Sequence, residues 1–433
     1  MKRRPFLSTA FWAGVGRIGG LLLPILIAGS YGADFKTDSF FFSYALTITV
    51  MSLFSHFFES AMIPHLASDA SSSGYAAKLI FAVLGLTLPI YVAAGLALAF
   101  LIEPILLISG WKQETAQTVS RLFFEFQPFL WLNLIISAMH GYLYHHGRFG
   151  KVAFSPFMRA TLVIIFMFAF RHSLGVHALT AGFIAGEIVR ALWLLPTFLS
   201  LLPKPFLWPD SACIPFVRRF FKDALLQTLA LVAINGMPLI NQWFAQMTGE
   251  GNLSLLSYAD RLVQIPYLLF LAGFLQIFHV DWSAAYIQPH PHFWDKVQRD
   301  TWRVGGISLM IALTLWFLAD PIITATYATN RLSNSDREML ISVFRWFVLG
   351  LAPGIPRLLL GRGLIAMKKS FFYLGQAWAE ILLSVILCSL FVRHWGIQGI
   401  AFANMLVYLV SAIWLWACFH WQFSRNGKKR EGA

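Results

Sequence analysis

The sequence predicts an all-α polytopic membrane protein, with twelve transmembrane helices in two six-helix bundles around a central cavity. Three observations support this fold class. The 433 residues are 58% hydrophobic and 12% charged, and the mean hydropathy is +0.66. A soluble domain carries roughly twice that charged fraction. Apolar stretches of bilayer-spanning length recur through the whole chain, and no segment between them is long enough to form a soluble domain.

Each predicted transmembrane helix is an apolar stretch long enough to cross a bilayer. The stretches lie at 9–31, 39–63, 78–102, 121–143, 153–171, 176–201, 219–247, 256–280, 304–319, 340–363, 371–392 and 397–421. Most of the 33 Lys and Arg residues fall in the loops and helix ends on the same side as Lys2–Arg4. This positive-inside bias predicts that both termini are cytoplasmic. The net charge of +13 then reflects topology and contact with anionic lipid, not nucleic-acid binding.

A proline-rich stretch divides the chain into halves. Four prolines lie within 202–215, where they form a stiff cytoplasmic linker that cannot continue a helix. We therefore predict an N-terminal six-helix bundle at 1–201, a C-terminal six-helix bundle at 216–423, and a basic cytoplasmic tail at 424–433.

Short matches between the halves indicate an internal repeat. Gly175 and the segment 191–193 recur, at one common spacing, as Gly396 and the segment 412–414. Other matches in the same order are 43–45 with 257–259, and Gly141 with Gly361. Because each half has an even number of helices, the repeats are parallel and related by an axis along the membrane normal.

Two cationic positions within apolar stretches suggest a binding site. Arg17 lies in the first predicted helix, and the pair Asp260–Arg261 opens the eighth. Charges at bilayer depth cost about 2.5–3.5 kcal/mol each, so they usually face a bundle interior or a watery cavity. A guanidinium fork suits phosphate oxygens, so we predict a cavity that receives an anion. The alternatives are snorkelling or a structural ion pair for Arg17, and neutralisation of Arg261 by Asp260.

Several other polar residues are weaker candidates. Asp38 is either the cap of the second helix, a role that Thr37 also suits, or a carboxylate that balances the arginines. Arg345 and Arg357 in the tenth helix would extend a basic lining, and His56 with Glu59 would relay a proton. Glu187 and Arg190 have the spacing of a structural intrahelical pair. Interhelical hydrogen bonds are the expected role of Asn235, Asn241, Gln242 and Asn404.

No cofactor or metal is expected. The histidines at 145–146 and 290–292 lie in predicted loops without neighbouring cysteines or carboxylates, so the spacing does not favour a metal site. The sequence contains no nucleotide-binding loop, so any energy source would be an ion gradient or the distribution of the substrate itself.

Four motifs carry a resemblance to a known family. They are Arg17, the segment Thr37–Phe41, the segment Tyr258–Pro266, and Gly147–Phe149. Together they resemble the MurJ/MviN family, flippases of lipid-linked peptidoglycan precursor within the multidrug/oligosaccharidyl-lipid/polysaccharide exporter superfamily. The resemblance implies that Arg17, Asp38 and Arg261 lie at a central cavity, where the arginines engage a diphosphate. Further cavity arginines of that family would fall at Leu23 and near Met51, and the family also has two additional helices.

The predicted function is therefore the flipping of a lipid-linked oligosaccharide or peptidoglycan precursor across a bacterial inner membrane. Its partners would be the lipid-linked glycan, membrane lipid and proteins of envelope biosynthesis. One alternative is an ion-coupled exporter of amphiphilic small molecules, and another is a non-transporting scaffold of envelope assembly. A membrane-bound glycan polymerase or ligase is disfavoured because the sequence predicts no sizeable outer loop, so we do not expect an enzyme.

Overall fold

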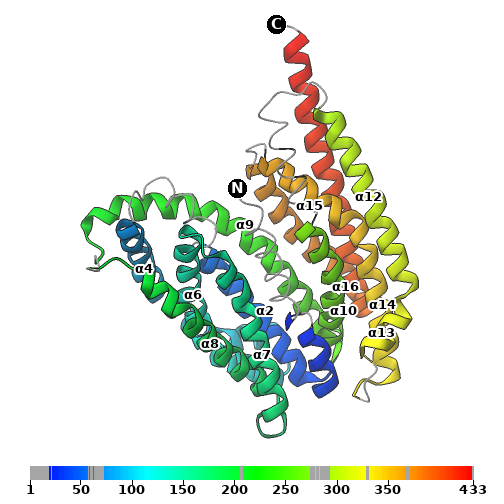
Figure 1. Ribbon diagram of the computed structural model, residues 1–433. Coiled ribbons are helices and arrows are strands. Elements are labelled where there is room, and N and C mark those ends of the chain that lie inside the picture. Colours follow the sequence, from blue (N-terminus) through cyan, green and yellow to red (C-terminus); the bar gives the residue numbers. More distant parts are fainter. Residues whose placement is uncertain are drawn as a thin grey trace. The chain divides into compact units, whose positions relative to one another are not determined.

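The computed structural model of the protein describes residues 19–20, 22–56, 58, 62, 73–204, 208–273, 278, 282, 293–327, 331–366 and 370–431. Every regular element within these ranges is a helix (Figure 1). The pattern of contacts divides the chain into two units, unit 1 at 1–239 and unit 2 at 240–433.

Unit 1 is a bundle in which long apolar helices pack around an aromatic core. Its helices are α2 (Phe35–His56), α4 (Ser73–Ile108), α5 (Gln113–Glu125), α6 (Gln127–His145), α7 (Phe149–Leu174), α8 (His177–Leu201) and the first part of α9 (Ile214–Gln246). The helices α7 and α8 pack along each other, α6 packs on α8, and α2 packs on α5 and α6. The rings of Phe126, Phe129 and Phe183 meet edge to face with centroids 5.7–5.9 Å apart.

The start of α2 corrects the predicted cap. Gly32 adopts a φ of +80°, which turns the chain just before the helix. Asp34 Oδ1 accepts a hydrogen bond from the Thr37 backbone N (2.8 Å), and Thr37 Oγ1 accepts one from the Asp34 N (2.9 Å). This reciprocal arrangement satisfies backbone donors that a helix start leaves unpaired. The cap is therefore Asp34 with Thr37, and Asp38 lies inside the first turn.

Unit 2 is a second all-helical bundle. Its helices are the end of α9, α10 (Asn252–Gly273), α12 (Phe293–Phe317), α13 (Ala319–Tyr327), α14 (Asn334–Leu349), α15 (Leu351–Ala366) and α16 (Ser370–Glu431). The helix α15 packs on α16 and α12, and α14 packs on α10 and α16. The axes of α12 and α13 meet at 63°, so these two helices form a bent pair.

Two glycines show that the halves repeat in structure as well as in sequence. Gly175 joins α7 to α8 with φ +57° and ψ −136°. Gly396 interrupts α16 with φ +54° and ψ −136°, between the eleventh and twelfth predicted membrane spans. This region of conformational space is almost restricted to glycine. Gly175 and Gly396, which the sequence repeat relates, therefore adopt the same backbone conformation.

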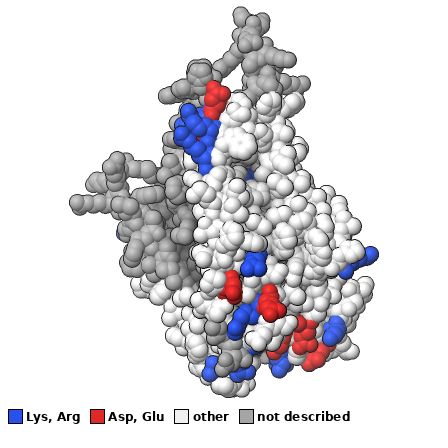
Figure 2. All heavy atoms as spheres, turned by 90° about the vertical axis from the view of Figure 1, so that its right-hand side faces the viewer, with Lys and Arg blue, Asp and Glu red and all other residues white. Residues whose placement is uncertain are grey.

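The described helices have the dimensions of membrane spans. Seven helical stretches are each long and apolar enough to cross a bilayer, and eight if the bent pair α12–α13 counts as one span. The outer face of α12 carries Trp302, Met310 and Phe317, which are about 70% exposed. On the face shown in Figure 2, charged side chains gather toward the two ends with an uncharged band between them. The predicted class of all-α polytopic membrane protein is thus confirmed.

The two interrupting glycines generate a prediction about stability. Replacing Gly175 or Gly396 by alanine forces a Cβ into an unfavourable backbone region, so each variant should lose about 1–3 kcal/mol of unfolding free energy. Equilibrium unfolding in mixed micelles of detergent and dodecyl sulfate measures this loss. Gly85→Ala, within α4 and with open space around the new Cβ, is the control and should be neutral or slightly stabilising. If all three variants lost the same unfolding free energy, this would contradict the conclusion that Gly175 and Gly396 need a backbone conformation reserved for glycine.

Candidate functional site

The charged pair of the eighth predicted span lies within α10 and not at its start. This helix begins at Asn252, so Asp260 and Arg261 are about two turns inside it, and both side chains are half-buried. Gln264 bridges the pair because its Nε2 donates to Asp260 Oδ2 (2.6 Å) and its Oε1 accepts from Arg261 Nη1 (3.3 Å). The expectation that the pair opens a helix was wrong, because the eight residues before it, 252–259, are already helical.

An ion pair lies between α15 and α16. Arg357 Nη1 donates to both carboxylate oxygens of Glu380 at 2.5 and 2.6 Å, and Gln376 Nε2 donates to the same carboxylate at 2.7 Å. The guanidinium also stacks over the ring of Tyr408, with its Cζ 4.7 Å from the ring centroid. The side chains of Arg357 and Glu380 are 15% and 6% exposed. Arg357 is therefore held by protein partners.

Tyr267 links the two polar groups. Its hydroxyl donates to the Gly350 carbonyl at 3.5 Å, and its ring packs against Gly354, where a Cβ would collide with it. Tyr408, the ring under the Arg357 guanidinium, borders the same Gly354, so Tyr267 of α10 and Tyr408 of α16 meet at this glycine. We call the residues Asp260, Arg261, Gln264, Tyr267, Arg357, Gln376, Glu380 and Tyr408 the unit 2 polar cluster.

The unit 2 polar cluster contains some of the residues that the sequence predicted for the site, and other predicted residues lie outside it. It contains Asp260 and Arg261, predicted to bind substrate, and Arg357, predicted to line the cavity. Arg345 lies instead against α12, with its Cζ 5.1 Å from the ring centroid of Trp316. Asp38 is fully buried in unit 1. Arg17, Glu59 and the side chain of His56 lie outside the described residues.

Sequence analysis missed Gln264, Tyr267, Glu380 and Tyr408. Two of these had a detectable signal. Gln264 lies three and four residues after the charged pair, which is the spacing of helix neighbours. Glu380 is a carboxylate within an apolar span, and such residues mark buried pairs or functional sites. The two tyrosines had no sequence signal, because their role depends on which helices pack together.

Unit 1 contains a second buried charge cluster. The predicted pair is present, with Arg190 Nη1 3.1 Å from Glu187 Oε1, but Arg159 from α7 joins it at 2.8 Å from the same oxygen. Asn133 Nδ2 donates to the same carboxylate at 3.3 Å. The predicted interhelical hydrogen bonds are confirmed for Asn241 with Asn404, at 3.2 Å, and for Gln242, which donates to Ser257 at 3.2 Å.

Long apolar helices with ionisable side chains buried at bilayer depth are typical of membrane transporters. Residues 27–430 match the family model described as Lipid II flippase MurJ, so the chain belongs to this family. It is 24% identical to the lipid II flippase MurJ of Burkholderia cenocepacia over 364 residues, which cover 80% of this chain and 70% of the relative. It is 23% identical to the probable lipid II flippase MurJ of Buchnera aphidicola over 415 residues, covering 92% of this chain and 80% of the relative.

Solved structures share the fold. A lipid II flippase MurJ in an inward closed conformation superposes with a TM-score of 0.80 at 20% identity, covering 94% of this chain and 86% of the other. An inward-facing multidrug resistance MATE family transporter gives a TM-score of 0.81 at 13% identity, covering 95% and 96%. At these identities the two likenesses establish the helical architecture alone.

The Arg357–Glu380 pair should be strongly coupled. Arg357→Met leaves a buried carboxylate without its guanidinium and should cost about 3–5 kcal/mol of unfolding free energy. The double variant Arg357→Met, Glu380→Met should cost less than the sum of the single losses. Equilibrium unfolding in mixed micelles gives all values, and the exposed Arg393→Met, expected within about 0.5 kcal/mol of wild type, is the control. If the loss of unfolding free energy in the double variant equalled the sum of the single losses, this would contradict a coupling between Arg357 and Glu380.

Proposed function

We propose that the protein is a flippase for a polyprenyl-diphosphate-linked oligosaccharide or peptidoglycan precursor, which it moves from the cytoplasmic to the outer leaflet by alternating access. One observation carries the proposal: a chain of the lipid II flippase MurJ family places the charged pair Asp260–Arg261 inside a helix of membrane-spanning length. Such a charge needs a function or a partner to offset its desolvation. A diphosphate headgroup is an anion that meets this need.

Arg17 and Arg261 are the proposed diphosphate ligands. A guanidinium stays charged at every physiological pH and offers paired N–H donors that match phosphate oxygens. Asp38 and Asp260 would balance these cations when no substrate is bound, which reduces the cost of an unpaired charge. Gln264 supports this role because its amide contacts both members of the pair and so restricts their rotamers.

The membrane potential suits export of such a substrate. With the termini and the positively charged loops in the cytoplasm of a bacterial inner membrane, a potential negative inside favours movement of anions outward. The gain is about 2.3 kcal/mol per charge per 100 mV, so a headgroup with two charges gains about 4.6 kcal/mol per 100 mV. The headgroup would cross the bilayer within the protein while the polyprenyl tail stays in lipid.

A second candidate is an ion-coupled exporter of amphiphilic small molecules. The fold is compatible with this function, since the chain superposes on a MATE family transporter as closely as on MurJ. Cationic amphiphiles would require a cavity rich in carboxylates and aromatic rings, so the arginines favour the flippase. A drug-efflux assay in an expressing strain separates the two functions, and a scaffold of envelope assembly would be inactive in both assays.

The transport test uses proteoliposomes with a fluorescent polyprenyl-diphosphate glycan and a membrane-impermeant quencher. Arg261→Ala should slow translocation at least about tenfold, because a charge-assisted hydrogen bond contributes about 1.5–3 kcal/mol. Arg261→Lys, which keeps the charge but loses the fork, should be intermediate, and Arg17→Ala should resemble Arg261→Ala.

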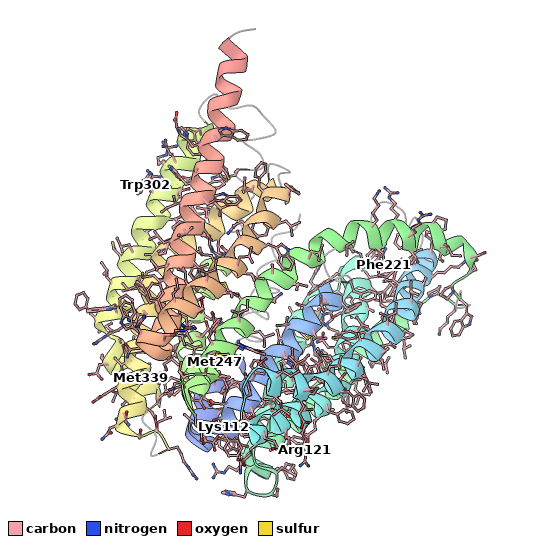
Figure 3. All side chains as sticks on the ribbon, turned by 180° about the vertical axis from the view of Figure 1, so that it is seen from behind. Lys112, Arg121, Phe221, Met247, Trp302 and Met339 are labelled. Atoms are coloured by element: carbon pink, nitrogen blue, oxygen red, sulfur yellow. The ribbon has the colours of Figure 1, made fainter. Side chains whose placement is uncertain are left out.

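The control for this test is Arg121→Ala on α5. Its side chain is 74% exposed and lies at one end of unit 1 (Figure 3), so transport should be unchanged. If Arg17→Ala and Arg261→Ala both translocated the glycan at the wild-type rate, this would contradict the proposed diphosphate contact.

A further inference from the structure

The helix α12 has a cationic end that adjoins a long uncharged stretch. No charged residue lies between Arg303 and Asp320, and the helical part of this interval, 304–317, is about 21 Å long at 1.5 Å per residue. The hydrocarbon core of a bilayer is about 30 Å thick, so this part of α12 crosses most of it. Arg303 therefore lies at the level where the hydrocarbon meets the lipid headgroups.

Two exposed arginines share one face at this end of α12. Arg299 and Arg303 are four residues apart, so their side chains are neighbours on the helix surface. Within the described ranges, neither guanidinium has an ion-pair or hydrogen-bond partner. Of the acidic residues in the same turns, Asp300 is buried and accepts a hydrogen bond from Trp282 Nε1 (3.1 Å), and Asp295 is exposed in the first turn.

Tryptophan rings lie next to these arginines. Trp302 is 72% exposed and lies on the outer face of α12 (Figure 3). Its ring meets Trp416 of α16 edge to face with centroids 5.9 Å apart, and Trp416 also contacts Trp294 at 5.2 Å. Indole rings favour the boundary between hydrocarbon and headgroups. The Nε1–H of an indole is a donor that suits a phosphate or glycerol oxygen.

An apolar stripe continues from the arginines along α12. Ile307 and Met310 follow Arg303 by four and seven residues, which is the spacing of one helix face, and Phe317 follows it by fourteen. These three apolar side chains are 55%, 69% and 71% exposed. A molecule that lies along this face meets cationic donors at one end and apolar surface over the rest of its length. The face thus matches an amphiphile with an anionic headgroup and hydrocarbon tails.

We infer that Arg299, Trp302 and Arg303 form a docking site on α12 for an anionic phospholipid of the surrounding bilayer. The guanidiniums bind the phosphate, because their paired N–H donors match its oxygens. The indole of Trp302 packs on the glycerol region, and one acyl chain follows Ile307 and Met310. Basic sites beside transmembrane helices bind anionic headgroups in this way. The site shares no residue with the unit 2 polar cluster and does not depend on the proposed transport.

The binding test uses the full-length protein in detergent micelles that contain phosphatidylcholine, to which phosphatidylglycerol is added. Phosphatidylglycerol should raise the thermal midpoint of the wild type in a saturable manner, and more phosphatidylcholine should not. The double variant Arg299→Gln, Arg303→Gln should weaken the apparent affinity for phosphatidylglycerol at least about tenfold, because charge-assisted hydrogen bonds are lost. A wild type whose midpoint does not respond to phosphatidylglycerol overturns the site.

The matched control is the double variant Arg331→Gln, Arg393→Gln. It removes the same charge from two exposed positions of unit 2 outside α12, so its titration with phosphatidylglycerol should resemble that of the wild type. Equal loss of affinity in the two double variants overturns the site, since the lipid would then respond to net charge alone.

Two further variants separate binding from a folding defect. Both change only exposed side chains, so their midpoints in phosphatidylcholine alone should match that of the wild type. Arg299→Lys, Arg303→Lys keeps both charges but loses the forks, so its affinity should lie between those of the wild type and the glutamine variant. Trp302→Leu loses the indole N–H and should weaken the affinity about threefold, the contribution of one hydrogen bond. Wild-type affinity in both variants overturns the site.

The same titration identifies the ligand. Glycerol phosphate has the anionic group without the acyl chains, so it should leave the midpoint unchanged at the concentrations at which phosphatidylglycerol saturates its effect. An equal increase with glycerol phosphate overturns the phospholipid assignment, because the apolar stripe would then contribute nothing. An increase that only a polyprenyl diphosphate produces also overturns it, because the site would then bind a different lipid.

Discussion

A charge that leaves water for the bilayer must find its partners inside the protein, and this constraint organises both units. The desolvation of a single guanidinium or carboxylate exceeds the contribution of any one packing contact. Glu187 and Glu380 are accordingly surrounded by donors from two or three helices. These clusters fix which helices are neighbours, because an incorrect neighbour would leave a charge unpaired.

The same constraint separates structural from functional charges. Arg190 and Arg357 each contact a buried carboxylate, Glu187 and Glu380 respectively, and Arg357 does so from the neighbouring helix α15. Arg159 reaches the same carboxylate of Glu187 from α7, and its side chain is 23% exposed. In unit 2, Gln264 shares its amide between Asp260 and Arg261, and all three side chains are half-buried on α10.

Family membership and structure answer different questions about this chain. The match over residues 27–430 establishes the family, and the low identities to solved structures establish the architecture alone. Neither comparison identifies the residues that would bind an anion, and the polar clusters provide candidates for this role.

The sequence by itself determined the fold class, the repeat and the Glu187–Arg190 pair, because composition, segment length and helix spacing are local properties of the chain. It also located Asp260 and Arg261, since a charge within an apolar stretch is visible in one dimension. It missed Arg159, Tyr267, Glu380 and Tyr408 as partners. Only the tertiary structure decided those contacts, because they join helices far apart in the chain and depend on which faces pack together.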